Sequence, residues 1–434
     1  MYQVTYSSAF SGGSLAMPAS KSAAIRAILC SALAPGASRL LHMEASQDIE
    51  TALNAAQTLG AQVAYDSPAR TASLTGCGSL PQKGAVHCGE SGALLRFIIP
   101  IAAALGGPWR FTGQGRLPER PLGVYGQLLP AHGVEFRTQG GLPLEIEGRL
   151  TPGRFSLPGN VSSQFVTGLM LALPLLEGDS EIVLTSPLES RGYVDMTLQT
   201  LADFGVEVLP AKEGWYVPGG QRCKPRDYPV EGDWSHAAFF LNLAALSPTG
   251  APVRITGLDP DSLQGDKACV EVFRGFGLDI AWEDGALTAQ NKHPGQPFGG
   301  LRGQTVDVAQ ITDMAPAAAV CAALSQGQTR FVNAARLRLK ESDRIAAMEA
   351  AVNALGGHAW SKEDELIIEG VERLSGGTAQ GRNDHRVVMA LAGAALRSAG
   401  PVHVTDAWSI NKTYPGFYRD LKQLGGGADV VQLG

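Results

Sequence analysis

Cationic side chains stand near the expected starts of several apolar helices. Lys21 and Arg26 lie in the first turns of one such helix, Arg96 lies one turn into a second, and Arg386 opens another. Helix N-termini present unpaired N–H groups and a partial positive charge, so a Lys or Arg added there builds a site for an anion. Each serine at these starts can be a simple cap, but the repeated pattern predicts a polyanionic ligand.

Carboxylates are predicted to lie among these cations. Residues 336–344 read Arg-Leu-Arg-Leu-Lys-Glu-Ser-Asp-Arg, which puts Glu341 between Lys340 and Arg344 at the expected mouth of an amphipathic helix. A carboxylate held among cations is available for proton transfer, and an arginine can grip a ligand carboxylate through two hydrogen bonds. Asp313 is expected to open another apolar helix, where its simplest role is an N-cap.

Two further cations, Arg120 and Lys412, are also predicted to lie at helix starts.

The chain has no P-loop, no dinucleotide fingerprint, no G-x-S-x-G elbow and no H-E-x-x-H motif. Its 6 cysteines form no C-x-x-C pair, so we expect reduced, mostly buried thiols and no metal site.

The composition is that of a globular protein of two or three domains. The chain has 434 residues, 44% of them hydrophobic and 18% charged, and a formal net charge of −6. This balance argues against a general nucleic-acid binder. The polar N-terminus does not read as a secretory signal, and the longest apolar stretches are too short to cross a bilayer, so a cytoplasmic protein is expected.

A repeat of about 72 residues runs through the sequence. A helical stretch, a bulky residue, a glycine and a strand-like piece recur at Gly60, Gly133, Gly205 and Gly277, in steps of 73, 72 and 72 residues. Weaker copies follow at Gly356 and Gly425. Glycine is the expected residue just past the end of a helix, where the backbone turns left-handed.

A second series of small, Ala-rich helices alternates with the first and brings the count to six units. These helices are apolar on nearly every face and should be buried. We expect two pseudo-symmetric α/β domains of three units each, the first over residues 15–230 and the second over residues 231–434 with the N-terminal strand 1–14. A β/α solenoid and a closed ring such as a sliding clamp remain open on periodicity alone.

These residues give the chain a resemblance to the enolpyruvyl transferase family, in particular to the branch that acts on shikimate 3-phosphate. The resemblance covers nearly the whole chain. The motifs that carry it are Ser20-Lys21-Ser22 with Arg26, Ser91-Gly92 with Arg96, Glu119-Arg120-Pro121, Ser162-Ser163-Gln164, Asp313, residues 339–344, Asn383-Asp384-His385-Arg386 and Lys412-Thr413-Tyr414-Pro415.

The resemblance implies two inverse α/β domains built from βαβαββ-type units, with the active site in the cleft between them. It also implies a monomer that transfers the enolpyruvyl group of phosphoenolpyruvate to shikimate 3-phosphate without a metal or cofactor. Shikimate 3-phosphate would be held by Lys21, Ser22, Arg26, Ser162, Ser163, Gln164, Ser190, Tyr193, Asp313 and Lys340. Phosphoenolpyruvate would be held by Lys21, Gly92, Arg120, Gln164, Arg344, Arg386 and Lys412.

By the same resemblance, Asp313 would be the base near the acceptor hydroxyl and Glu341 the acid near the methylene carbon, with Lys21 assisting. The family's Asn-Ala-Gly-Thr loop is replaced here by residues 90–93, Glu-Ser-Gly-Ala, Phe97 replaces a common proline, and Arg336 stands where Asn or Glu is common. These departures leave the response to glyphosate open. The alternatives are the sister enzyme that acts on UDP-N-acetylglucosamine, disfavoured because the loop before Arg120 has no cysteine, and a ring-shaped scaffold without activity.

Overall fold

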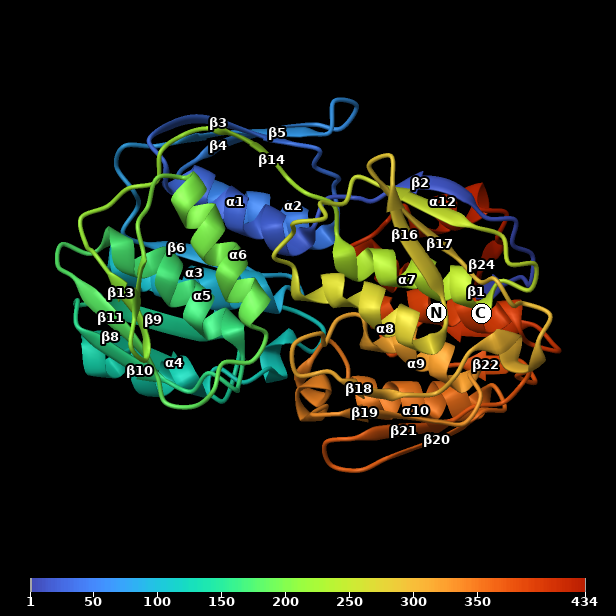
Figure 1. Cartoon of the computed structure of the whole chain (residues 1–434). Helices are drawn as coiled ribbons and strands as arrows, with labels where there is room; N and C mark the ends of the chain where they lie inside the picture. The colour runs from blue at the N-terminus through green and yellow to red at the C-terminus, as the bar shows by residue number, and fades with distance from the viewer. Residues whose placement is uncertain (1, 434) are drawn as a thin grey trace. The chain divides into compact units, whose positions relative to one another are not determined.

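The computed structural model describes residues 2–433 and divides the chain into two compact units (Figure 1). The 19–231 unit is continuous, and the 232–434 unit combines the chain from Gly232 with the chain up to Pro18. Residues 15–18, which the sequence analysis assigned to the first domain, belong to the other unit. The reason is strand β2 (Gly13–Ala16), which pairs in parallel with β15 (Val253–Thr256).

One βαβαββ pattern occurs six times and makes six four-stranded sheets. In each sheet the first two strands of the repeat are parallel, and the fourth strand lies between the second and the third, antiparallel to both. One example is the sheet of β6 (Gly84–His87), β7 (Trp109–Thr112), β9 (Leu144–Gly148) and β8 (Val134–Thr138), in that order. Strand β6 is parallel to β7, and β9 is antiparallel to β7 and β8. The predicted fold class is therefore confirmed.

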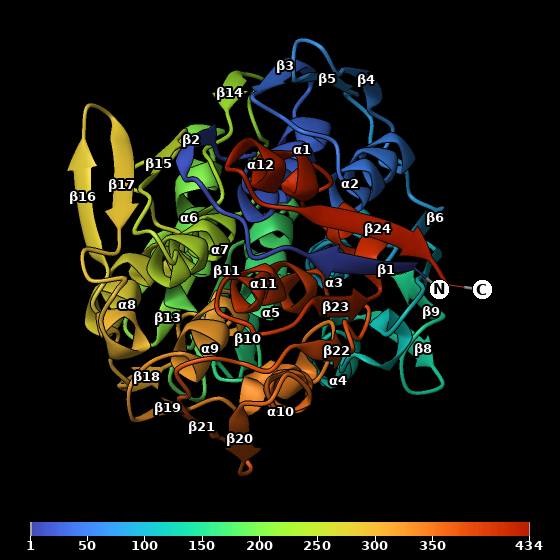
Figure 2. The ribbon, with the colours of Figure 1, turned by 90° about the vertical axis from the view of Figure 1, so that its right-hand side faces the viewer.

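Three strands reach their sheets from distant parts of the sequence. Strand β14 (Asp227–Pro229) pairs with β3 (Gly36–Leu41) and completes the first sheet of the 19–231 unit. In the 232–434 unit, β2 pairs with β15. Figure 2 shows β1 (Tyr2–Tyr6) between two C-terminal strands, β23 (Val402–Thr405) and β24 (Ala428–Gln432). The N-terminal segment thus contributes two strands to two different sheets.

The 19–231 unit has three repeats around three central helices. Its helices are α1 (Lys21–Leu33), α2 (Gln47–Thr58), α3 (Gly92–Leu105), α4 (Gly123–Leu128), α5 (Ser163–Ala172) and α6 (Arg191–Asp203). Its other strands are β4 (Gln62–Asp66), β5 (Thr71–Gly76), β6 (Gly84–His87), β7 (Trp109–Thr112), β8 (Val134–Thr138), β9 (Leu144–Gly148), β10 (Arg154–Leu157), β11 (Ser180–Leu184), β12 (Leu209–Ala211) and β13 (Gly214–Val217).

The 232–434 unit repeats this plan. Its helices are α7 (Trp234–Leu246), α8 (Cys269–Phe276), α9 (Ala315–Ala323), α10 (Arg344–Ala354), α11 (His385–Leu396) and α12 (Phe417–Gln423). Its other strands are β16 (Asp279–Glu283), β17 (Ala286–Gln290), β18 (Thr305–Asp307), β19 (Gln328–Val332), β20 (His358–Ser361), β21 (Leu366–Glu369), β22 (Gly377–Ala379), β23 (Val402–Thr405) and β24 (Ala428–Gln432).

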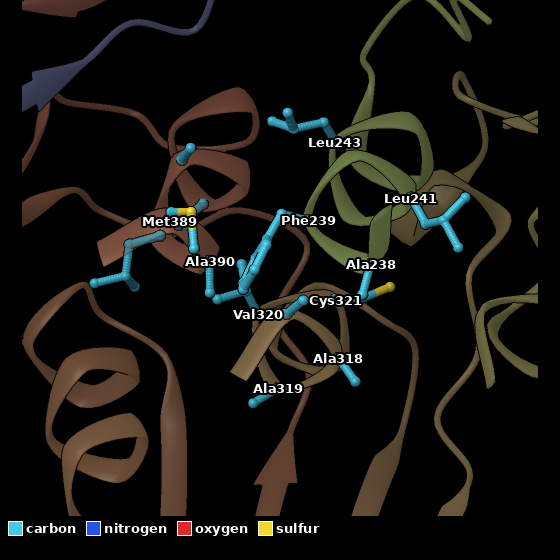
Figure 3. Close-up of a cluster of buried hydrophobic side chains, with 14 of the residues drawn as sticks. Ala238, Phe239, Leu241, Leu243, Ala318, Ala319, Val320, Cys321, Met389 and Ala390 are labelled. Carbon is cyan, nitrogen blue, oxygen red and sulfur yellow. The ribbon is translucent and has the colours of Figure 1, made fainter. Parts of the chain in front are cut away.

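The central helices of each unit form its core. In the 232–434 unit, α7, α9 and α11 pack on one another, and every residue of α7 is buried. Figure 3 shows Phe239 of α7 reaching toward Val320 of α9, with Met389 and Ala390 of α11 alongside. Burial of these small apolar side chains brings the N-terminal ends of the helices, and the polar residues they carry, into fixed positions.

The repeat glycines end the outer helices as predicted. All six have a left-handed backbone, with φ between 73° and 111°, which a residue with a Cβ atom rarely adopts. They are Gly60, Gly133, Gly205, Gly277, Gly356 and Gly425.

Candidate active site

A buried carboxylate accepts hydrogen bonds from backbone N–H groups at the start of each central helix of the 232–434 unit. Asp233 Oδ1 accepts hydrogen bonds from the backbone N–H groups of Ser235 (2.9 Å) and His236 (3.1 Å) at the start of α7. Asp384 Oδ1 accepts from the N–H of Arg386 at the start of α11 (2.9 Å). Buried Asp266, which precedes α8, accepts from the N–H of Met314 just before α9 (3.0 Å). Each carboxylate offsets the positive end of a helix dipole.

Arg344 joins three carboxylates around one buried guanidinium group. Its Nε donates to Asp384 Oδ2 (2.9 Å), its Nη1 to Asp313 Oδ1 (2.7 Å) and its Nη2 to Glu341 Oε2 (2.7 Å). The Arg344 side chain is only 1% exposed, whereas those of Glu341 and Asp313 are 15% and 17% exposed. Both candidate acid–base residues are therefore partly exposed and share a buried cation at the start of α10.

Asp313 bridges two arginines instead of capping α9. Its Oδ2 accepts from Arg386 Nη2 (3.1 Å), and Lys340 Nζ lies 3.6 Å from its Oδ1. The N-cap residue of α9 is Met314, so the expected capping role of Asp313 is wrong. Its carboxylate binds cations, and the N–H of Met314 donates to Asp266 instead.

Burial and charge shift the pKa values of these cations in opposite directions. Burial lowers the pKa of Lys340 to about 8, against the raising effect of Asp313. For Arg344, burial alone would lower the pKa, but Asp384, Glu341 and Asp313 together raise it above its ordinary value. Arg344 is therefore a permanent cation, while Lys340 can lose its proton in mildly alkaline solution.

Lys412 and Arg120 do not start helices. Lys412 is the last residue of a short 3-10 helix (Ala407–Lys412), and its Nζ donates to the carbonyl of Asn383 at 2.5 Å, next to the cap of α11. Arg120 follows another 3-10 helix (Leu117–Glu119) and is extended, with φ −71° and ψ 135°. Proline at position 121 disfavours a helical backbone in the residue before it.

In the 19–231 unit, Arg26 is a buried cation with neutral partners. Its Nε donates to Thr197 Oγ1 (2.8 Å), and its other nitrogens donate to the Ser22 carbonyl (2.6 Å), the Tyr193 carbonyl (2.8 Å) and Thr167 Oγ1 (3.4 Å). Its guanidinium also lies 5.0 Å from the centre of the Phe97 ring. Burial lowers the pKa of Arg26 to about 10, which marks a cation that a bound anion would stabilise.

The start of α5 is tied to Arg96. Arg96 Nη1 donates to Gln164 Oε1 (2.6 Å), and its guanidinium lies 5.0 Å from the centre of the Phe165 ring. Ser162 is the N-cap of α5 and accepts from the N–H of Gln164 (3.3 Å), while Ser163 is the first helical residue and is buried. The predicted Ser-Ser-Gln motif therefore lies at a helix N-terminus.

Lys21 begins α1 and pairs with a carboxylate that sequence reasoning missed. Its Nζ lies 3.2 Å from Asp48 Oδ2, in the first turn of α2, and both side chains are largely buried. Ser20 caps α1 by accepting from the N–H of Ala23 (3.4 Å). Nothing in the local sequence around Asp48 distinguishes it from an ordinary first-turn acid.

Gly92 and Arg120 are in direct contact. A Cβ atom at Gly92, the first residue of α3, would lie 2.4 Å from Arg120 Nη1, so only glycine leaves room for this guanidinium. The unexpected Glu90 packs its carboxylate against Gly115. Ser190, buried before α6, has a left-handed backbone with φ 53°.

The predicted site residues thus gather in two sets. In the 232–434 unit, Asp313, Lys340, Glu341, Arg344 and Arg386 form one ion-pair network, with Lys412 next to the helix cap. In the 19–231 unit the remaining residues lie at the starts of α1, α3, α5 and α6 and in the segment around Arg120. Sequence reasoning missed Asp233, Asp266 and the pairing role of Asp384.

Residues 2–433 contain neither a cluster of metal-ligating side chains nor a membrane-spanning helix. Among these residues, no group of three or more His, Cys, Asp or Glu side chains is arranged to hold a metal ion. None of the helices described there is long and apolar enough to span a membrane.

Comparison with known proteins identifies the family of the chain. The family described as EPSP synthase (3-phosphoshikimate 1-carboxyvinyltransferase) matches residues 7–421. Relatives named 3-phosphoshikimate 1-carboxyvinyltransferase from Clostridium kluyveri and Clostridioides difficile are each 40% identical, over 97% of this chain and 97% of theirs. The solved structure of EPSP synthase from Acinetobacter baumannii superposes with a TM-score of 0.81 at 25% identity and covers 100% of both chains. The chain therefore belongs to the EPSP synthase family.

Proposed function

We propose that this chain transfers the enolpyruvyl group of phosphoenolpyruvate to the 5-hydroxyl of shikimate 3-phosphate and releases phosphate. The observation that carries the proposal is a pair of carboxylates, Asp313 and Glu341, that both accept hydrogen bonds from the buried guanidinium of Arg344. This reaction needs one group that accepts a proton and another that donates one, among cations that tolerate two anionic substrates. Membership of the family supports the same reaction.

Shikimate 3-phosphate would bind mainly to the 19–231 unit. Arg26 is the strongest support, because its acceptors are neutral and its buried charge favours a phosphate. The helix N-termini that begin near Ser22, Ser162 and Ser163 add N–H donors. The full proposed set is Lys21, Ser22, Arg26, Ser162, Ser163, Gln164, Ser190 and Tyr193, with Asp313 and Lys340 from the other unit.

Phosphoenolpyruvate would bind to cations of both units. The proposed set is Lys21, Gly92, Arg120, Gln164, Arg344, Arg386 and Lys412. Arg344 and Arg386 present planar donors that suit a carboxylate. Their donors are occupied by Asp313 and Glu341 in the unliganded chain, so a substrate carboxylate must replace part of those contacts.

The chemistry proceeds by addition and elimination. Glu341 donates a proton to C3 of phosphoenolpyruvate while the 5-hydroxyl oxygen attacks C2 and gives its proton to Asp313. The C2–O bond to phosphate then breaks, C3 returns a proton to the Glu341 carboxylate, and the double bond is restored on the new ether. The proton from the 5-hydroxyl passes from Asp313 to the leaving phosphate. Lys21 assists by compensating charge on the leaving phosphate.

The two sets of residues belong to different units, so the proposal requires both units to contact the same substrates. We expect shikimate 3-phosphate to bring the units together and to lower the radius of gyration in small-angle scattering. In this proposal the chain acts as a monomer in the cytoplasm, where both charged substrates are retained, and it binds no nucleic acid.

Phosphate release from phosphoenolpyruvate with shikimate 3-phosphate as acceptor tests the function. We expect Glu341→Ala and Lys21→Ala to lower kcat by about 100-fold or more. Glu349→Ala, on the same helix as Arg344 but outside the network, is the matched control and should leave kcat unchanged. Absence of release by the wild-type chain, release with UDP-N-acetylglucosamine as acceptor instead, or full activity of both variants would contradict the proposal.

A further inference from the structure

His236 stands out among buried titratable residues because the proposed chemistry does not use it. It lies in the first turn of α7, its side chain is 0% exposed, and its Nε2 lies 3.1 Å from Thr413 Oγ1. Its ring centre is also 4.9 Å from that of Tyr414. A fully buried imidazole that contacts two consecutive residues of another segment fixes that segment in place.

The contacted segment carries Lys412. Thr413 follows Lys412 directly, at the point where the 3-10 helix ends. Its backbone is no longer helical, with φ −135°. The N–H groups of Thr413 and Tyr414 both donate to the carbonyl of Ile410. The backbone around Lys412 is therefore a tight turn whose outer side rests on His236.

The opposite side of Lys412 is held by a different helix. Lys412 Nζ donates to the carbonyl of Asn383 at 2.5 Å, beside Asp384, the cap of α11. The backbone of Lys412 therefore lies in a turn that contacts α7, and its ammonium group binds a carbonyl at the start of α11. Loss of the contact with α7 would let the turn, and the ammonium group with it, move by the fraction of an ångström that weakens an ionic hydrogen bond.

His236 lies against the cap of its own helix, which binds its backbone N–H. Asp233 Oδ1 accepts from the His236 N–H at 3.1 Å, and Asp233 Oδ2 lies 3.8 Å from His236 Nδ1. Asp233 interacts electrostatically with His236 and, more weakly, with Arg386, and both interactions favour its charged form. The cap thus connects the imidazole to a cation of the proposed phosphoenolpyruvate site.

We propose that His236 is a positioning residue that, through its hydrogen bond to Thr413, sets the place of Lys412 for binding phosphoenolpyruvate. The inference rests on the proposed function, because it takes Lys412 as a ligand of that substrate. It adds a residue that touches neither substrate and acts through the turn 412–414.

Steady-state kinetics of four variants test this role. His236→Phe keeps the ring contact with Tyr414 but removes the hydrogen bond, and Thr413→Val removes the same bond from the other side. We expect each to raise KM for phosphoenolpyruvate about tenfold, with kcat and KM for shikimate 3-phosphate changed less than about twofold. Thr413→Ser, which keeps the hydroxyl, should restore the wild-type KM, and the double variant His236→Phe/Thr413→Val should be no worse than the poorer single variant.

Asn242→Ala is the matched structural control. It removes another buried hydrogen bond from α7, the one from Asn242 Nδ2 to the Ala390 carbonyl (3.1 Å), away from the turn 412–414. We expect it to lower Tm while leaving KM for phosphoenolpyruvate unchanged. Lowered Tm with unchanged KM in the His236 and Thr413 variants, or additive effects in the double variant, would overturn the inference.

The proposed function can fail separately. If the wild-type chain releases no phosphate, the function itself is wrong. If it does, and Lys412→Ala raises KM for phosphoenolpyruvate while His236→Phe does not, only the positioning role is wrong.

Discussion

The two units begin their central helices in different ways. In the 19–231 unit the cap positions of α1, α3 and α5 are occupied by Ser20, Ser91 and Ser162. In the 232–434 unit, α7 and α11 begin on Asp233 and Asp384, and Asp266 accepts a hydrogen bond from the start of α9. Neutral hydroxyl caps leave the positive helix ends available to a ligand anion, whereas carboxylate caps neutralise them.

The buried arginines follow the same division. Arg26 in the 19–231 unit donates to hydroxyl and carbonyl oxygens, whereas Arg344 in the 232–434 unit donates to three carboxylates. Arg26 therefore presents charge to neutral partners, whereas the charge of Arg344 is already balanced by carboxylates. We infer that the first mainly receives a phosphate and that the second mainly moves protons.

The largest expected effect is on stability, and it distinguishes the two buried arginines when each is replaced by methionine. Arg344→Met leaves Asp384 buried without its counter-ion, and we expect the free energy of unfolding to fall by about 3–5 kcal/mol. Arg26→Met leaves no buried charge behind, so we expect a change within about 1 kcal/mol. Urea-induced unfolding measures both, and equal losses for the two variants would remove the distinction between the units.

Gly92→Ala probes the 19–231 unit without changing charge. The added Cβ would displace the mobile end of Arg120, so the fold should tolerate it while the guanidinium loses its place. Loss of a charge-assisted hydrogen bond costs about 2 kcal/mol, which corresponds to a KM for phosphoenolpyruvate about 30-fold higher. Steady-state kinetics at saturating shikimate 3-phosphate check this, and an unchanged KM would separate Arg120 from that substrate.

Alkaline pH should act on the 232–434 unit first. The pKa of Lys340 is lowered to about 8 and that of Arg26 to about 10, so Lys340 loses its charge first as pH rises. We expect KM for shikimate 3-phosphate to rise about fivefold between pH 8 and pH 9. The folded-state pKa is below that of an exposed lysine, so burial of the charged Lys340 side chain destabilises the fold. This cost falls as pH rises over the same range.

Lys340→Arg is the control for that titration, since arginine stays charged at these pH values. It should flatten the pH dependence of KM. A KM for the wild-type chain that is constant to pH 9 would show that Lys340 does not hold the substrate.

The smallest expected effect concerns a neutral cap. Ser162→Ala removes the hydroxyl that accepts from the Gln164 N–H, and we expect thermal unfolding to report a loss of about 1 kcal/mol. Asp384→Ala should cost several times more, because it also releases Arg344 and Ser342. Similar costs for the two caps would weaken the comparison.

Local signals in the sequence predicted much of this architecture. The spacing of glycines such as Gly205 and Gly277 predicted the repeat, because a left-handed residue must end each outer helix. The pairing of β2 with β15 was not predicted, since strand partners distant in sequence leave no local pattern.

The sequence indicated candidate site residues, but few of the contacts between them. Lys340, Glu341 and Arg344 lie together because they share one short segment. Asp48, Asp233 and Asp266 look like ordinary first-turn or cap acids in sequence, and only the fold brings them to Lys21, Arg386 and Met314. The assignment of substrates to these residues stays a prediction.

Titration calorimetry with shikimate 3-phosphate alone tests the central claim that the uncompensated cation of the 19–231 unit receives the phosphate. The account predicts that Arg26→Met raises Kd by about 30-fold. Arg386→Met removes a cation that is already paired with Asp313, so it should change Kd less than about threefold. Normal binding by Arg26→Met, or an equal loss in Arg386→Met, would contradict it.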